Sequence, residues 1–292
     1  MVDIFRQFIK EIICSDDEDM FNYIWCWLIF ICKFPHLKSK VALFLVSKEG
    51  CGKGFLIDFL CHYIIGDYNT IPNMNGIDQL VGEKNLRLLG KKLVSVNELS
   101  SNKNTFSSSL NKIKSIITED DLSIRPLYCE GFNAKQTLEL IFSSNFANSM
   151  IISESDRRMV VPTINECHQN DKAYFGSLRN KLYNVDAANS IYTTLFNSNL
   201  KSSDFYLMHI PMSARKLEIK DISKSNCCVF IDEYREDEDN DQSIETKDLW
   251  NSYLHWCSQN NEKAYRKQLF KSMIIEYGVR FVKSNGKLLY VL

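Results

Sequence analysis

Residues 41–55 read Val41-Ala-Leu-Phe-Leu-Val-Ser-Lys-Glu-Gly-Cys-Gly-Lys-Gly-Phe55. The apolar run 41–46 is typical of a buried β-strand, and the apolar stretch 55–65 after the glycines is typical of a helix. With the elements in this order, the N–H groups of the turn and the helix N-terminus can surround a phosphate. We therefore predict a phosphate-binding loop here; a chance surface turn is the alternative.

The predicted nucleotide-binding residues are Ser47, Gly50, Cys51, Gly52, Lys53 and Gly54. Small residues let the backbone close around the β-phosphate, and Lys53 is placed to reach the β- and γ-phosphates of ATP. Ser47 stands where the usual G-x-x-x-x-G-K-[ST] pattern has its first glycine, and Gly54 stands where a hydroxyl binds Mg²⁺. We expect Mg²⁺ to be held by water, by carboxylates and by the phosphates themselves.

Two further apolar strands are predicted over residues 92–98 and 137–142, and polar residues stand at or just after their ends. Glu98 is expected to polarise the attacking water and to act on Mg²⁺ through the nucleotide. Asn97 precedes it, where an Asp more often holds magnesium. Asn145 follows the second strand, where its amide can hydrogen-bond both the γ-phosphate and the water. A solvated strand end and a turn-forming asparagine are the alternatives.

Arg157 and Arg158 follow soon after Asn145, in the stretch Asp156-Arg-Arg-Met-Val-Val161. An arginine that reaches the nucleotide of a neighbouring subunit stabilises the negative charge of the transition state. We predict this catalytic role for the pair. Two surface arginines without a role are the alternative.

The composition limits the class of protein. A chain of 292 residues with 45% hydrophobic and 24% charged residues has room for one α/β core with small satellites. A net charge of −1 argues against a protein that coats nucleic acid by bulk charge. The ten cysteines include no C-x-x-C pair, so reduced thiols in an intracellular protein are expected, with no zinc site. The apolar run 23–34 is shorter than the ~20 residues of a membrane span and predicts a buried helix.

The predicted organisation is a helical N-terminal segment (1–40), an ATPase core with a mostly parallel sheet (41–165), a helical continuation (166–231), an acidic linker (232–243) and a C-terminal module (244–292). Seven of the ten residues 232–241 are acidic, and such a block does not bury enough apolar surface to order itself. Residues 244–292 hold eight Lys or Arg against four acids, a net charge of +4.

The ordered set 50–53, 97–98, 113–118, 141–145 and 157–158 resembles the helicase domain of superfamily 3. It is most similar to the viral, phage and plasmid primase-helicase group, which includes the poxvirus primase-helicase and the helicase domains of phage primase-polymerases. The resemblance covers about residues 5–200. It implies an α/β fold of the P-loop NTPase class with a modified AAA+ core, with ATP and Mg²⁺ as cofactors. No catalytic primase carboxylates precede the loop, so a primase is expected on another chain or on a longer parent chain.

The resemblance also implies a DNA helicase that travels 3′→5′ on single-stranded DNA as a homo-hexameric ring, in the replication of a virus or mobile element. The other partner expected from it is a primase or polymerase; no membrane partner is expected, and the host cytoplasm or nucleus is the place of action if the source is viral. A hairpin over residues 122–135 would place Arg125 and Lys135 in the pore, although the lysine that many members carry near Leu127 is absent. A nucleotide-gated replication-initiation scaffold that binds DNA with weak or no unwinding is the alternative.

The C-terminal module is similar to the winged-helix modules that often close these proteins. One helical stripe is expected from Leu249, Tyr253 and Trp256, and a second from Leu269, Met273 and Tyr277. The runs 279–282 and 288–291 across Asn285-Gly286 predict a hairpin. The predicted DNA-binding residues of this module are Arg266, Lys267 and Lys271; a solvated basic face is the alternative.

Overall fold

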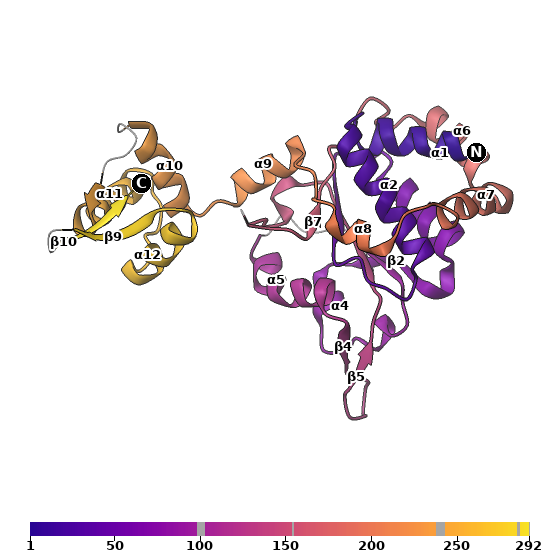
Figure 1. The fold of residues 1–292 in the computed structure, drawn as a ribbon, viewed down its shortest axis with the longest axis horizontal. Helices are drawn as coiled ribbons and strands as arrows, with labels where there is room; N and C mark the ends of the chain where they lie inside the picture. The colour runs from indigo at the N-terminus through magenta and orange to yellow at the C-terminus, as the bar shows by residue number, and fades with distance from the viewer. Residues whose placement is uncertain (98–102, 154, 238–242, 285–286, 292) are drawn as a thin grey trace. The chain divides into compact units, whose positions relative to one another are not determined.

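The computed structural model describes residues 1–97, 103–153, 155–237, 243–284 and 287–291. The chain forms two compact units, Met1–Ile222 and Ser223–Leu292, which we call the first and the second unit (Figure 1). Over the described ranges, no helix has both the length and the apolar character needed to cross a bilayer.

A five-stranded parallel sheet lies at the centre of the first unit. Its order is β2-β3-β6-β1-β7, with bounds β1 Ala42–Val46, β2 Thr70–Asn75, β3 Leu93–Asn97, β6 Glu139–Ser144 and β7 Met159–Val160. The three strands predicted from apolar runs are confirmed as β1, β3 and β6. The sequence analysis missed β2 and β7, the two edge strands, because one is interrupted by polar residues and the other is very short.

Both faces of the sheet are covered, and β1 explains why. Its residues alternate between two hydrophobic clusters: Leu43 and Leu45 face one, and Ala42, Phe44 and Val46 face the other. A strand buried on both faces reads as a continuous apolar run, with no polar alternation. The predicted mostly parallel α/β architecture is thereby confirmed.

One face of the sheet is covered by the N-terminal helices, by the two helices between β1 and β2, and by helices that follow the sheet in the chain. Their bounds are α1 Val2–Gln7, the π-helical η1 Phe8–Ile13, α2 Glu18–Lys33, α3 Lys53–Asp58, the π-helical η2 Phe59–Ile65, α6 Lys172–Leu182, α7 Val185–Phe196 and α8 Ser202–Leu207. The apolar run 23–34 is the buried part of α2, which begins where the Asp17 carboxylate accepts a hydrogen bond from the Met20 N–H at 3.0 Å. The N-terminal helices are therefore part of the core of the first unit.

The other face is covered mainly by α4, α5, the roots of a hairpin and α9. The bounds of these and the remaining short elements of the first unit are η3 Asp67–Asn69, α4 Ile77–Val81, η4 Leu86–Leu88, α5 Lys103–Thr118, β4 Asp121–Ile124, β5 Phe132–Lys135, η5 Ala147–Ser149 and α9 Ala214–Ser223. Strands β4 and β5 pair antiparallel, so the hairpin predicted over residues 122–135 is confirmed.

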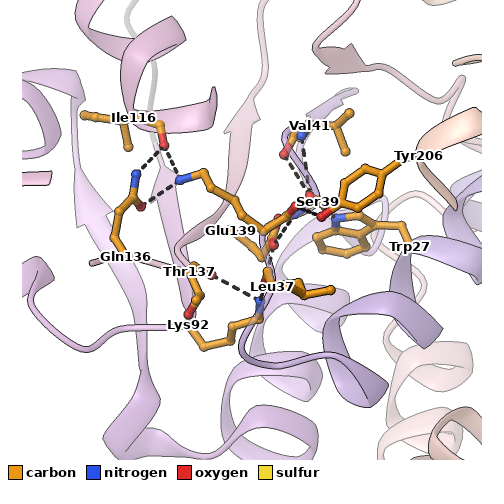
Figure 2. A network of polar contacts seen from close by, with 11 residues as sticks. Trp27, Leu37, Ser39, Val41, Lys92, Ile116, Gln136, Thr137, Glu139 and Tyr206 are labelled. Atoms are coloured by element: carbon orange, nitrogen blue, oxygen red, sulfur yellow. Dashed lines mark hydrogen bonds and ion pairs between the residues drawn. The ribbon is translucent and has the colours of Figure 1, made fainter. Parts of the chain in front are cut away.

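A buried polar network closes the amino end of the sheet, where β6 begins with Glu139 (Figure 2). The Glu139 carboxylate, 1% exposed, accepts hydrogen bonds from the Ser39 N–H at 2.9 Å and from the Lys92 ammonium at 3.3 Å. Lys38, 4% exposed, donates to the Ile116 carbonyl and to Gln136 Oε1 at 2.7 Å. These bonds join the segment before β1 to β3, α5 and β6. They therefore fix the amino end of the sheet, opposite the end where the glycine-rich loop 47–52 follows β1.

The second unit has its own hydrophobic core, built from three helices and a three-stranded antiparallel sheet of order β8-β10-β9. Its elements are α10 Asn226–Asp237, β8 Ser243–Glu245, α11 Thr246–Gln259, α12 Lys267–Glu276, β9 Arg280–Ser284 and β10 Lys287–Val291. The predicted C-terminal hairpin is confirmed as β9–β10; its Asn285-Gly286 turn lies outside the described residues.

Two expectations for the C-terminal part differ from the structure. The boundary between the units precedes the predicted linker 232–243: residues 226–237 are helix α10, held by apolar contacts of Phe230 and Ile231 that the acidic composition obscured. In α12 the buried stripe is Phe270 and Ile274, while Leu269 of the predicted stripe is 46% exposed. Met273 and Tyr277 of the predicted stripe pack against the core as partly buried side chains, so the prediction is wrong for Leu269 alone.

Candidate functional site: the glycine-rich loop and the sheet edge beside it

The glycine-rich loop 47–52 connects the carboxyl end of β1 to the first residue of α3, Lys53. Gly50 and Gly52 have φ angles of +78° and +93°, in the left-handed region that glycine adopts most readily. Cys51 is buried between them, and Ser47 is buried at the end of the strand. Gly54, the second residue of α3, has open space around it and supplies no hydroxyl. The loop thus has the predicted position between strand and helix.

Lys53 is 7% exposed, and its ammonium lies inside the loop. It donates to Ser47 O at 2.7 Å, to Lys48 O at 2.8 Å and to Ser47 Oγ at 3.0 Å. Burial lowers the pKa of Lys53 from its usual 10.5. These acceptors are neutral oxygens, which solvate the ammonium but do not cancel its charge. An anion at the loop would compensate that charge.

Asn145 is brought to Lys53 by the pairing of neighbouring strands. Because β6 lies beside β1 in parallel, with Ser144 opposite Val46, the residue after β6 lies at the start of the loop. The Lys53 ammonium donates to Asn145 Oδ1 at 3.0 Å. The two residues, 92 positions apart in the chain, therefore form one polar site, as their places after two strands predict.

Asn97 is the last residue of β3, on the far side of β6 from β1. Its amide oxygen accepts from Ser95 Oγ at 2.8 Å, and its amide nitrogen donates to Asn73 Oδ1 within β2. Glu98, the predicted catalytic carboxylate, lies outside the described residues. In the described part of the chain, no group of three or more His, Cys, Asp or Glu side chains could hold a metal ion.

A cavity of about 370 Å³ opens at the loop. Its lining includes Gly50, Lys53 and Asn145, and also Phe175 and Arg179 of α6. The Arg179 guanidinium lies 4.2 Å from the centre of the Tyr183 ring, and the Tyr183 hydroxyl donates to the Phe55 carbonyl at 2.8 Å. The α6 pair was missed by the sequence analysis, because one aromatic and one cation in a helix carry no motif.

The segment 166–170 before α6 holds the outer side of the loop. The Asn170 N–H donates to the Gly50 carbonyl at 3.1 Å, and Gln169 Nε2 donates to the Glu49 carbonyl at 3.2 Å. The Lys48 ammonium pairs with the Glu166 carboxylate at 2.8 Å. These bonds use loop carbonyl groups and the Lys48 side chain, and they hold the loop against the helical continuation of the unit.

Arg157 and Arg158 lie at the amino end of the parallel strands, whereas Lys53 lies beyond their carboxyl end. The Arg158 carbonyl accepts from the Ala42 N–H at 2.8 Å, at the amino end of β1, whereas Lys53 follows its carboxyl end. The five residues of β1 separate the two ends of the strand by roughly 16 Å, at about 3.3 Å per residue. The pair therefore does not join the Lys53 site of its own chain.

The two arginines line a second cavity, of about 830 Å³. Asp156 fixes their turn, because its carboxylate accepts from the N–H groups of Arg158 at 3.1 Å and Met159 at 2.9 Å. Lys216, 1% exposed, also lines this cavity and donates to the Met159 carbonyl at 2.7 Å. Among the described side chains, Arg158 Nε, Ser198 Oγ and Arg215 Nε are buried without a hydrogen-bond partner within the chain.

The predicted DNA-binding cations of the hairpin are at its root. Lys135 pairs with Asp121 at 3.0 Å, and Arg125 lies 3.8 Å from Glu83. In the second unit, the Lys271 ammonium lies 3.7 Å from the centre of the Phe281 ring and that of Lys267 5.9 Å from Trp250. Arg266, just before α12, is exposed. The structure thus gives most of these cations partners inside the chain.

Comparisons with known proteins give a family model, a phage protein and solved structures of part of a phage protein. A family model described as a family of unknown function (DUF5906) matches residues 45–158. The DNA Primase-polymerase of Nitratiruptor phage NrS-1 is 28% identical over 162 residues, which are 55% of this chain and 22% of that protein. The chain therefore spans under a quarter of the length of this relative.

Two solved structures of the NrS-1 C-terminal region have the same fold as this chain. The first matches with a TM-score of 0.71 and the second, its A form, with 0.70; both are apo structures at 20% sequence identity. Each match covers 100% of this chain and 75% of the solved chain. At that identity the likeness concerns the fold.

Proposed function

We propose that the chain is an ATP-dependent DNA helicase motor of the superfamily 3 type, acting in the replication of a virus or mobile element. One observation carries the proposal: the buried Lys53 ammonium is surrounded by neutral oxygens of the loop and by Asn145. A triphosphate at the loop would supply the missing negative charge. The similarity to a phage DNA Primase-polymerase supports a replication role.

In this proposal Lys53 holds the β- and γ-phosphates, while Asn145 orients the γ-phosphate and the attacking water. Mg²⁺ would neutralise phosphate charge; since Gly54 has no hydroxyl, it would be held by the phosphates, by water and by Glu98. Phe175 and Arg179 line the same cavity, where the guanidinium is suited to a phosphate oxygen and the ring to an apolar part of the nucleotide.

The positions of Arg157 and Arg158 support a ring assembly, because the amino end of the sheet, where they lie, is remote from Lys53 of the same chain. If a neighbouring copy places its nucleotide against this end of the sheet, the two guanidinium groups would lie beside the γ-phosphate and stabilise the negative charge of the transition state. The homo-hexamer, the 3′→5′ direction and a primase or polymerase partner are what the resemblance implies. The second unit, with Arg266 and Lys267 exposed, is the proposed winged-helix contact to DNA or to that partner.

The second candidate function is a nucleotide-gated replication-initiation scaffold without unwinding. It is favoured by Gly54 and Asn97, which stand where a hydroxyl and a carboxylate would bind Mg²⁺. Strand displacement separates the two candidates, with duplexes that carry a 3′ tail, a 5′ tail or no tail. The motor unwinds the 3′-tailed duplex with ATP, and Lys53→Ala does not. ATP turnover without unwinding of any duplex would establish the scaffold instead.

A further inference from the structure

The cavity of about 830 Å³ at the amino end of the sheet has two kinds of lining. One part is cationic and includes Arg157, Arg158 and Lys216, and another is aromatic or apolar and includes Tyr206 and Met208. The volume falls within the range of ~300–1,000 Å³ that is typical of sites for small ligands. The lining is therefore suited to a small ligand with an anionic end and an uncharged body.

The Lys216 ammonium is a buried charge with incomplete compensation. The residue is 1% exposed, its ammonium donates to the Met159 carbonyl at 2.7 Å, and the Asp156 carboxylate lies 3.9 Å away. That carboxylate also accepts from the backbone N–H groups of Arg158 and Met159. Burial lowers the pKa of Lys216 from its usual 10.5, and Asp156 opposes the shift. An anion beside Lys216 would stabilise its charged form.

Arg158 adds a donor that the protein itself does not satisfy. Of the three buried side-chain atoms without a hydrogen-bond partner in the described part of the chain, Arg158 Nε is the one whose residue lines this cavity. A buried N–H group without an acceptor is costly, and its cost is larger when the group is charged. An oxygen atom of a ligand would remove that cost.

The charges of the lining indicate which anion fits. Lys40 also lines the cavity, but it is exposed and lies 3.6 Å from Asp120, so we do not assign it to the ligand. The cations Arg157, Arg158 and Lys216 then face Asp156 as the one carboxylate among the described lining residues, which leaves two positive charges in excess.

A terminal phosphate matches this excess better than other common anions do. It carries a charge of about −1.5 to −2 at neutral pH, and guanidinium groups bind its oxygens in a bidentate manner. A carboxylate ligand would supply one negative charge, and so would each phosphodiester of a nucleic-acid strand. A phosphodiester also carries chain on both sides, which hinders its approach to a lysine that is 1% exposed.

We propose that this cavity binds a small ligand with a terminal phosphate group, either inorganic phosphate or a nucleoside monophosphate. The phosphate lies against Arg158 and Lys216, and the exposed Arg157 closes over it. The base of a nucleotide packs against Tyr206, which Figure 2 shows beside the buried polar network and whose hydroxyl donates to the Lys38 carbonyl at 2.7 Å.

The site belongs to one chain, so the inference goes beyond the proposed function and does not rest on it. Arg157 and Arg158 would serve either this ligand or the nucleotide of a neighbouring copy at any one time. The small ligand would therefore compete with a neighbour for the two guanidinium groups.

Calorimetric titration of the full chain with inorganic phosphate and with AMP tests the proposal. The titrations use the Lys53→Ala protein, in which the glycine-rich loop lacks its ammonium group. Both ligands should bind, and Arg158→Gln in that protein should weaken binding about 10- to 150-fold, the range for one hydrogen bond to a charged group. AMP that binds more tightly than phosphate identifies a nucleotide as the ligand, and equal binding identifies phosphate itself.

Arg215→Gln is the matched control. Arg215 Nε is also buried without a partner among the described residues, and Arg215 precedes Lys216 in α9, but it is not among the residues that line the cavity. Arg157→Gln is a second variant, at an exposed residue whose replacement leaves the core intact. It should weaken binding as well, and it decides the test if Arg158→Gln does not fold.

Three outcomes would overturn the proposal. They are no binding of phosphate or AMP by the Lys53→Ala protein, binding that neither arginine variant weakens, and binding that Arg215→Gln weakens as much as Arg158→Gln does. Oligothymidylate binding that depends on Arg158, without binding of AMP or phosphate, would assign the cations to a nucleic-acid strand instead.

The result is separable from that of the proposed function. Arg158-dependent binding of phosphate or AMP, in a chain whose wild type lacks ATP turnover, supports the cavity site and contradicts the motor. Lys53-dependent turnover without any binding of these ligands to the Lys53→Ala protein contradicts the cavity site and leaves the motor in place.

Discussion

Gly50 is the loop position least able to accept a side chain. A Cβ there would lie 2.1 Å from Asn170 Oδ1 and 2.9 Å from the Asn170 backbone nitrogen, and the φ of +78° is strained for any other residue. Gly54, four residues later, has a helical backbone and nothing within 4 Å of the Cβ position. Glycine is therefore required by the structure at position 50, whereas position 54 has room for a side chain.

Gly50→Ala should lower the free energy of unfolding by about 1–3 kcal/mol, because the strained backbone and the contact with Asn170 both oppose the methyl group. Gly54→Ala should change it by less than about 1 kcal/mol, towards greater stability. Urea denaturation of both variants measures the difference. Equal effects at the two positions would contradict the described conformation of the loop.

The network at the amino end of the sheet joins its elements by pairing buried polar groups, which hydrophobic packing alone would leave without partners. Lys38 is the member whose charge costs most, because burial lowers its pKa from 10.5 to about 8. Between these values the unfolded chain holds a proton on Lys38 that the folded chain has lost. The Lys38 contribution to stability therefore rises with pH across this window.

This pH dependence is measurable with Lys38→Met, which keeps an apolar stem of similar length. The unfolding free energy of the wild type should rise relative to that of Lys38→Met as the pH increases from 8 to 10.5. The comparison removes the buried tyrosines and thiols, which titrate in both proteins. Lys40→Met, at an exposed neighbouring lysine, is the control. A constant difference between wild type and Lys38→Met would show that Lys38 keeps an ordinary pKa when folded.

At the level of elements, the sequence analysis succeeded where a local pattern is produced by burial. Continuous apolar runs identified β1, β3 and β6, and the parallel order of the first and last explains why Asn145 meets Lys53. Phe175 and Arg179 escaped it, because they reach the loop through the packing of α6, which no local pattern encodes. The hairpin was located correctly, but ion pairs that engage Arg125 and Lys135 depend on the fold.

For the whole molecule, Lys53 and Arg158 lie at opposite ends of the strands of one sheet, and this placement leads to a specific prediction about assembly. If each arginine pair acts on a neighbour's nucleotide, a double variant Arg157→Ala, Arg158→Ala and a Lys53→Ala variant should each lack turnover alone. Mixed together, they should regain part of it, because some interfaces combine an intact loop with an intact pair. Rings that form at every mixing ratio without any recovered turnover would contradict action between subunits.

The central claim is that the loop 47–53 binds ATP for hydrolysis, and steady-state ATP turnover tests it most directly. The wild type, Lys53→Ala, Glu98→Gln and the control Lys40→Ala are compared, since Lys40 is an exposed lysine before β1, at the end of the strand opposite the loop. We predict turnover by the wild type and Lys40→Ala, its loss in Lys53→Ala, and nucleotide binding without turnover in Glu98→Gln. Turnover unchanged in Lys53→Ala and Glu98→Gln would contradict the claim.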